Sequence, residues 1–351
     1  MTTSALWPPR IRVLDGPGGR RVLLDLRAAT LVPLLLLALL LLCAASLTVG
    51  DSDIPARTVA SALVGDGEPG TVRIVTQWRL PRTLLAVLGG ACLALSGAIF
   101  QSMTRNPLGS PDIIGFSAGA YTGSLLVTLV LGGAGLSVAA GAFLGGLVTA
   151  ILVYALAFRR GVQGFRLIVV GIAVSAVLAA LNSYLLVTAQ LEEAVTAAIW
   201  GAGSLNGARW VDASLVAGSL ALLAPGCVLL CRRMRMLELG DDFARALGVN
   251  AERTRVALIV LGVGLVSVTT AVTGPITFIA LAAPQIAKRM VHASGPALLT
   301  SALTGAGLLL ASDLIAQRII APNQYPVGVV TACLGGTYLV WLMSRRQKDI
   351  A

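Results

Sequence analysis

The sequence predicts an all-α polytopic membrane protein with about ten transmembrane helices. Of its 351 residues, 56% are hydrophobic and only 12% are charged, and the mean hydropathy is +0.87. Soluble domains carry roughly 25% charged residues, about twice this share. The apolar residues also form runs close to the roughly 20 residues that cross a hydrocarbon core about 30 Å thick. Short charged or Gly/Pro-rich stretches separate these runs, as expected for loops between spans.

Ten apolar runs are predicted to be spans. In chain order they cover roughly residues 29–49, 81–103, 111–132, 136–158, 167–189, 211–231, 255–273, 275–290, 297–319 and 325–344. The seventh and eighth runs are the hardest to separate, because residues 256–287 carry no charge. A single helix of about 32 residues would measure roughly 48 Å, which is too long for one span. Gly274 and Pro275 supply a break, since proline disfavours helix at the residue before it.

The first run is predicted to be an uncleaved span. Its basic leader is nearly thirty residues long, and both the leader and the apolar core are long for a cleaved signal peptide. We therefore expect three parts: a mobile cytoplasmic tail over residues 1–27, a membrane domain over 28–346, and a cytoplasmic C-terminus over 347–351. The membrane domain includes two short cytoplasmic helices within residues 238–254.

The distribution of Lys and Arg predicts that both termini are cytoplasmic. With the N-terminus inside, six of the 26 basic residues fall on outer segments and the remaining 20 on inner ones, which is the bias of the positive-inside rule. The net charge of +10 is then a topology signal. A nucleic-acid patch would also carry lysine, and the chain has two lysines, so no nucleic-acid partner is expected. The six outer residues are Arg57, Arg73, Arg79, Arg82, Arg209 and Arg318.

The sequence contains no pattern typical of an enzyme. Its five cysteines lack metal-ligand spacing, and no nucleophile with a nearby general base can be assembled, so we expect no catalytic residue, metal site or bound cofactor. Neither lysine follows a glycine, which rules out the nucleotide-binding GxxxxGK[ST] loop. If ATP drives the process, another subunit must bind ATP and Mg²⁺. An ion-coupled carrier is the rival interpretation, with Asp313 and Asp112 as weak support for it.

The stretch "LELGDDFARALGVNAERTR" predicts two short inner helices that meet at a sharp corner. Asp241 can cap the first helix, and Phe243 and Leu247 share one of its faces. Gly248 suits the left-handed residue after the first helix, and Asn250 can cap the second. Such a defined corner favours docking to a partner protein, although an amphipathic loop resting on the headgroups remains the alternative. The candidate residues are Asp241, Phe243, Ala246, Leu247, Gly248, Val249 and Asn250.

The stretch "GPITFIALAAPQIAKRMV" predicts a bent span. Gly274, Pro275 and Pro284 interrupt an apolar run that is short for a straight crossing. Broken helices of this kind line or gate cavities, and they also occur where packing alone tolerates them.

Five stretches in order and at the expected spacing resemble the FecCD family, the permease subunits of ABC importers for iron siderophores, haem and vitamin B12. They are "RLPRTLLAVLGGACLALSGAIFQ", "RNPLGSPDIIGFSAGA", "ALGVN", "GPITFIALAAPQIAKRM" and "YPVGVVTACLGG". The form "NPLGSPDIIGFSAGAYTG" looks most like the G-type permeases of ferric enterobactin systems. The resemblance implies ten spans per subunit and an importer in the cell inner membrane.

The resemblance also implies partners. It implies a related second permease subunit, with a homodimer as the alternative, two ATPase subunits docked inside, and a soluble or lipid-anchored binding protein that delivers the ferric siderophore outside. In the vitamin B12 importers of this family, outer arginines of the permease meet acidic residues of the binding protein. The matching positions here are Arg79, Arg82 and Arg318, for which snorkelling at the membrane interface is the plainer alternative.

Overall fold

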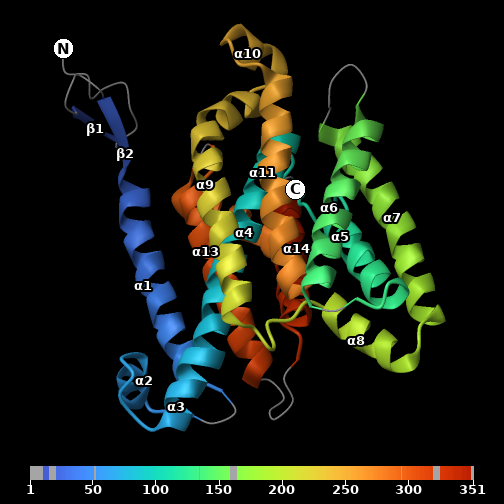
Figure 1. The fold of residues 1–351 in the computed structure, drawn as a ribbon. Coiled ribbons are helices and arrows are strands. Elements are labelled where there is room, and N and C mark those ends of the chain that lie inside the picture. Colours follow the sequence, from blue (N-terminus) through green and yellow to red (C-terminus); the bar gives the residue numbers. More distant parts are fainter. Residues whose placement is uncertain are drawn as a thin grey trace.

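The computed structural model is a bundle of membrane-length helices preceded by a small hairpin (Figure 1). It describes residues 11–15, 21–50, 53–133, 135–158, 164–293, 295–318 and 325–348. The hairpin consists of β1 (Ile11–Asp15) and β2 (Arg21–Asp25), which pair antiparallel with Ile11 opposite Asp25. The sequence predicts a mobile tail here and no strands, so the hairpin differs from that expectation.

Ten helices correspond to the ten predicted spans. They are α1 (Leu26–Thr48), α4 (Leu80–Thr104), α5 (Phe116–Leu125) with the π-helix η3 (Leu126–Val130), α6 (Leu136–Ala157), α7 (Gly164–Thr188), α9 (Trp210–Glu238), α11 (Ala251–Thr273), α12 (Ile279–Val291), α13 (Leu298–Arg318) and α14 (Val327–Lys348). Within the described residues, seven helical stretches are long and apolar enough to cross a membrane. The shorter members are α5 with η3, α12, and the apolar part of α14.

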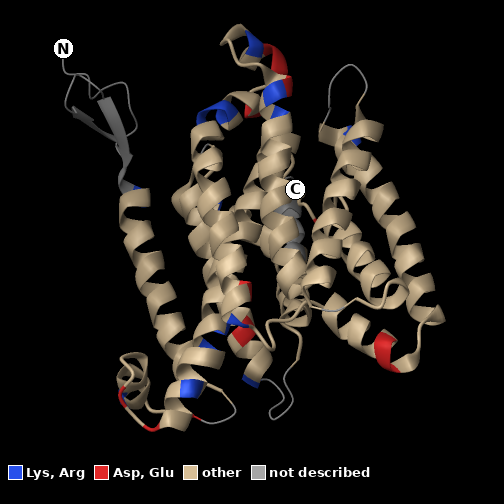
Figure 2. Cartoon of the chain, in the orientation of Figure 1, with Lys and Arg blue, Asp and Glu red and all other residues tan. Residues whose placement is uncertain are grey.

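Further short helices lie outside these spans. They are α2 (Ala56–Leu63), α3 (Pro69–Arg73), the π-helix η2 (Ile74–Arg79), α8 (Leu191–Gly201) and α10 (Asp241–Ala246). Figure 1 shows α10 at the end of the bundle where α1 begins, and α2, α3 and α8 at the opposite end. We call these ends the α10 face and the α8 face. Lys and Arg gather at the α10 face, and a smaller mixed group of charges lies at the α8 face (Figure 2).

Helix α4 lies at the centre of the bundle, because its small residues let other helices approach it closely. It packs against α9, α11, α12 and α13, and its side chains from Gly89 to Thr104 are all buried. A Cβ added to Gly97 would collide with the backbone carbonyl of Ala280 on α12, and one added to Gly90 would collide with the backbone of Gly305 on α13. Close approach through small residues is the usual way that helices pack in membranes.

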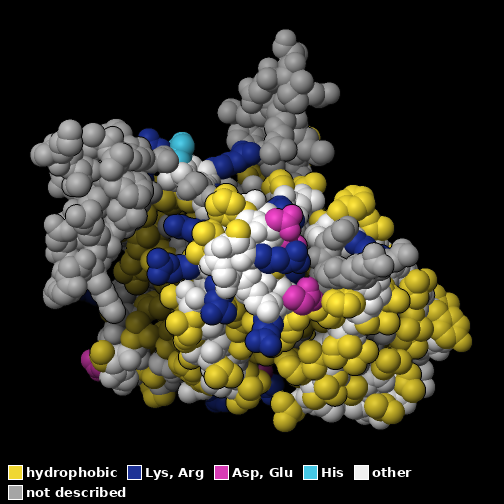
Figure 3. All heavy atoms as spheres, turned by 90° about the horizontal axis from the view of Figure 1, so that it is seen from above, with side chains coloured by type: hydrophobic (Ala, Val, Ile, Leu, Met, Phe, Trp, Pro, Cys, Tyr) yellow, Lys and Arg dark blue, Asp and Glu magenta, His cyan; other side chains and the backbone are white. Residues whose placement is uncertain are grey.

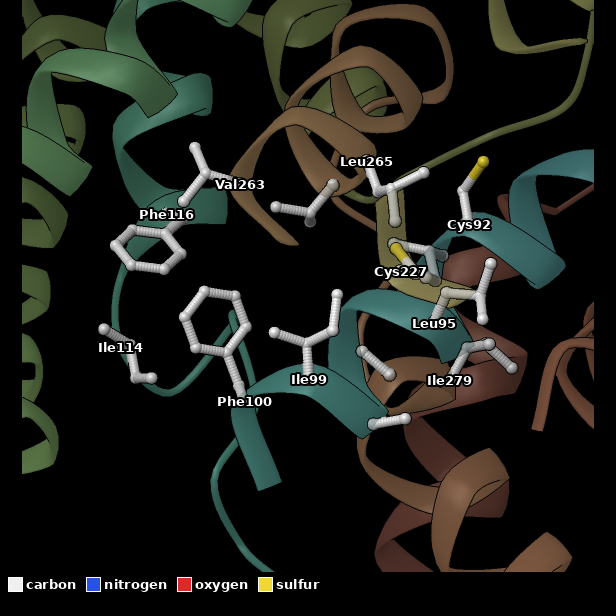
Figure 4. Packing of buried hydrophobic residues seen from close by; sticks show 14 of the residues in the cluster. Cys92, Leu95, Ile99, Phe100, Ile114, Phe116, Cys227, Val263, Leu265 and Ile279 are labelled. Carbon is white, nitrogen blue, oxygen red and sulfur yellow. The ribbon is translucent and has the colours of Figure 1, made fainter. Parts of the chain in front are cut away.

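The main apolar core extends along most of α4, from Leu85 to Met103. Phe100 of α4 and Phe116 of α5 pack with their ring centroids 5.2 Å apart and their planes tilted by 53° (Figure 4). Cys92 and Cys227 are fully buried among these apolar side chains. Residues 105–115 lead into α5, which begins only after Gly115 at a φ of +94°. This irregular connection explains why the third predicted span begins later than its apolar run.

Candidate functional site

The corner on the α10 face has the geometry that its sequence predicts. Gly248, which follows the C-cap residue Leu247 of α10, has a φ of +79°. The N–H of Val249 donates to the carbonyl of Ala244 at 2.9 Å, and the N–H of Gly248 donates to the carbonyl of Arg245 at 2.9 Å. These two hydrogen bonds define a Schellman end. The side chain of Asn250 accepts from the N–H of Arg253 at 3.0 Å, which caps α11. The polypeptide therefore turns at a fixed angle between α10 and α11.

The corner presents an apolar surface to its surroundings. Phe243 and Leu247 are 52% and 53% exposed, and Ala246 is also exposed. Val249 instead packs against the main core, and Ala244 is fully buried, so the opposite side of α10 is anchored. Figure 3, which looks onto this face, shows basic side chains around the corner. An anchored helix with exposed apolar residues and a basic surround has the chemistry of a protein-docking surface.

Asp241 does not cap α10 as the sequence predicted. The residue at the N-cap position is Gly240, which has no side chain to accept a hydrogen bond, and Asp241 is the first residue of the helix. Its carboxylate instead pairs with Arg255 of α11 and lies 3.7 Å from the guanidinium of Arg105. The prediction was wrong because a buried arginine, 14 residues further along the chain, attracts the carboxylate away from the backbone.

Arg82 is held within the membrane domain at the α8 face. Its Nε donates to Oδ2 of Asp313 at 2.9 Å and its Nη2 to Oδ1 at 2.8 Å, which is a bidentate pair between α4 and α13. Gln317 donates to the same carboxylate at 2.8 Å. The Asp313 side chain is 0% exposed and that of Arg82 is 14% exposed. This pair joins the ends of two spans.

Arg79 and Arg318 also have contacts within the chain. Nη1 of Arg79 donates to the backbone carbonyls of Leu47 at 2.8 Å and Thr48 at 3.0 Å, which are carbonyls at the end of α1. Arg318 pairs with Asp53, and both side chains remain substantially exposed, at 48% and 70%. Of the three arginines that the sequence analysis brought together, Arg318 is therefore the most accessible to a partner. Their docking role stays a prediction.

A cavity of about 1280 Å³ lies beside these arginines at the α8 face. Arg73, Arg79, Arg82 and Arg209 line it, together with Trp78. Arg209 is hydrogen-bonded to Asp212, which raises the pKa of its guanidinium and keeps it cationic. Arg82 and Arg209 are each paired with an aspartate, so the positive charge at this opening is smaller than its four guanidinium groups alone would give, and it still favours an acidic partner or an anionic solute.

The predicted bent span is present as a break between α11 and α12. Gly274 follows α11 at a φ of +70°, and a Cβ there would collide with the carbonyl of Trp200. Residues 274–278, which include Pro275, form no helix, and Pro284 lies inside α12. Whether this segment acts as a gate stays a prediction.

Two glutamines form a polar contact inside the bundle that was not predicted from the sequence. Gln101 of α4 donates to the carbonyl of Leu281 at 2.9 Å, and Gln285 donates to Gln101 at 2.6 Å. Together they fasten α12 to α4 beside Pro284. Two glutamines in separate apolar runs, at positions 101 and 285, were the available signal.

Comparison with known proteins supports a transport role. The family model of the FecCD transport family matches residues 36–345. The ferric enterobactin transport system permease protein FepG of Escherichia coli is 50% identical over 290 residues, which cover 83% of this chain and 88% of that protein. The achromobactin transport system permease protein CbrC of Dickeya dadantii is 38% identical over 90% of this chain and 91% of its own length.

A solved structure of similar fold agrees with these relatives. It is an inward-facing metal-chelate type ABC transporter, with a TM-score of 0.81 and 28% sequence identity, and the match covers 90% of this chain and 99% of that one. The family model and the relatives each cover most of the chain. This protein belongs to the FecCD transport family.

Proposed function

We propose that this protein is a permease subunit of an ABC importer that carries a ferric siderophore of the enterobactin class across the cell inner membrane. The observation that carries the proposal is the 50% identity to FepG over 83% of this chain. Vitamin B12 and haem are the alternative cargoes, because permeases for both occur in the family.

The proposed assembly contains a second, related permease, two ATPase subunits and a binding protein. ATP and Mg²⁺ would be bound by the ATPases, since the sequence has no nucleotide-binding loop. The exposed apolar corner of Phe243 and Leu247 supports docking of an ATPase at the α10 face, which would then be cytoplasmic together with both termini. The arginines at the α8 face support docking of an acidic binding protein there. A homodimer of this chain is the alternative to the heterodimer.

The geometry of Asp313 favours this proposal over an ion-coupled carrier. Asp313 is occupied by a bidentate arginine and a glutamine, whereas Asp112 accepts a hydrogen bond from Ser117 through Oδ1 at 2.5 Å and carries no weight in this comparison. Carriers that couple to protons or sodium need a carboxylate that gains and loses a cation during transport. A carboxylate held by a fixed guanidinium is poorly suited to that role.

The cargo can be tested with the reconstituted complex of both permeases and the ATPases in vesicles. We expect binding-protein-dependent uptake of ferric enterobactin labelled with radioactive iron. Unlabelled ferric enterobactin should compete with this uptake, whereas haemin and vitamin B12 should not. Uptake of haemin or vitamin B12 in place of ferric enterobactin would overturn the proposed cargo and leave the ABC permease assignment intact.

A further inference from the structure

Asp241 connects the exposed corner to two membrane-spanning helices. Its carboxylate pairs with Nη2 of Arg255, whose side chain is 4% exposed and belongs to α11. It also lies 3.7 Å from Nη2 of Arg105, the residue that ends α4 in the left-handed region at a φ of +53°. One carboxylate at the start of a six-residue helix thus lies between the ends of α4 and α11.

The same face holds other polar links between spans. The hydroxyl of Tyr154 on α6 donates to Glu252 in the first turn of α11 at 2.6 Å. Lys288 of α12 pairs with Glu238 at the end of α9 at 3.4 Å. Helices α4, α6, α9, α11 and α12 therefore each have an end joined to a neighbour at this face. Through Asp241, α10 is joined to α4 and α11 in this arrangement.

The neighbouring carboxylate has a different role. Asp242 is fully exposed, and its ion pair at 3.4 Å is with Arg245 of the same short helix. That pair is an i,i+3 contact within α10 and reaches no span. Asp241 and Asp242 are consecutive residues of the same type on one helix, so they form a natural pair of test and control.

From these contacts we infer that Asp241 is the positioning residue that couples movement of α10 to α4 and α11. A helix of six residues has little stability of its own. Helix α10 is also preceded by Gly240 at a φ of +118°, which supplies no side-chain cap, so the start of the helix needs a restraint from the side. The pair with buried Arg255 supplies that restraint. This inference rests on the proposed function, in which an ATPase presses on the α10 face.

The chemistry of Arg255 explains why the restraint is strong. A guanidinium that is almost wholly buried needs a counter-charge, since a buried cation without a partner is costly. The carboxylate of Asp241 therefore keeps its place while α10 is pushed. The contact of Asp241 with Arg105 is the weaker of the two, because it is longer and the side chain of Arg105 is 45% exposed.

The test compares Asp241→Asn with Asp242→Asn in the complete reconstituted importer, with ferric enterobactin as the probe. Three quantities are measured: co-purification of the ATPase, ATP hydrolysis, and uptake per ATP hydrolysed. For Asp241→Asn we expect the ATPase to remain bound and uptake per ATP to fall about tenfold, within the roughly 5- to 150-fold range of a typical coupling between sites. Asp242→Asn should match the wild type, and Asp241→Glu, which keeps the charge, should recover part of the coupling.

Three results would overturn the inference. The first is normal uptake per ATP for Asp241→Asn in a wild-type complex that transports. The second is an equal loss for Asp242→Asn. If Asp241→Asn does not assemble, Arg255→Lys replaces it, because it keeps a cation beside Asp241 and removes the guanidinium that forms the pair. Normal coupling in that variant is the third result. A wild-type complex without ATP-driven uptake would instead overturn the proposed function, and the inference with it.

Discussion

At the scale of single residues, the surroundings of each arginine decide what it can do. Arg82 and Arg318 both lie at the α8 face and both are paired with aspartate. Arg82 is paired with a carboxylate that is 0% exposed, whereas Asp53, the partner of Arg318, is 70% exposed. A buried pair is costly to break on one side only, while an exposed pair contributes little. Arg82 is therefore a structural residue, and Arg318 is the better candidate for contact with a partner.

This difference predicts that breaking the two pairs lowers the stability of the protein by unequal amounts. Asp313→Asn leaves the guanidinium of Arg82 without its counter-charge, so it should lower the free energy of unfolding by about 3–5 kcal/mol. The matched control is Arg318→Gln, which breaks an exposed pair and should cost about 0–1 kcal/mol. The measurement is thermal unfolding of the purified chain in detergent. Equal unfolding temperatures for Asp313→Asn and the wild type would show that the buried pair does not hold α4 to α13.

The proposed docking of a binding protein gives a second prediction at this scale. Arg318→Glu should slow association with the reconstituted complex at low salt, because rim charges act mainly on encounter rate. The effect should shrink as salt is raised, since the screening length is about 8 Å at physiological ionic strength. Arg57→Glu is the control, because Arg57 is another exposed arginine at the α8 face but is not one of the three positions that match the docking arginines of the family. Identical association rates for both variants at low salt would exclude a special role for Arg318.

At the scale of elements, the corner between α10 and α11 combines a fixed backbone with exposed apolar side chains. The Schellman end and the Asn250 cap fix the direction of the chain, while Phe243 and Leu247 stay accessible. A loop that rested loosely on headgroups would need no such caps. The bent segment before α12 is instead enclosed by other parts of the chain. A Cβ added to Gly274 would collide with the backbone carbonyl of Trp200.

The corner predicts the effect of one introduced charge. Leu247→Asp places a carboxylate on the proposed docking surface. An unpaired charge desolvated at an interface costs about 3 kcal/mol or more, which weakens ATPase binding by roughly two orders of magnitude. The control is Val64→Asp, because Val64 is an exposed apolar residue (81%) that follows α2 at the other face. The measurement is the dissociation constant of the ATPase, and normal binding by Leu247→Asp would refute docking at this corner.

At the scale of the whole molecule, the ten spans were predictable from the lengths of the apolar runs, together with the break that Gly274 and Pro275 make between the seventh and eighth. The turns at Gly248 and Asn250 were also predictable, since their residue types match local backbone requirements. Long-range pairs were not: Arg82 and Asp313 are 231 residues apart, and no local pattern joins them. Asp241 was predicted to cap its own helix because its pair with Arg255, 14 residues away, also leaves no local pattern in the sequence. The short helix α8 was missed because it lies beyond the predicted spans and carries no span-length signal.

We propose that ATP hydrolysis by a partner, and not an ion gradient, drives transport through this chain. The most direct measurement is uptake of labelled ferric enterobactin into vesicles that contain both permeases, with the ATPase, ATP and ion gradients supplied separately. We expect uptake with ATP and ATPase, none when either is omitted, and no change when proton and sodium gradients are collapsed. Uptake driven by a proton or sodium gradient without ATP would contradict it.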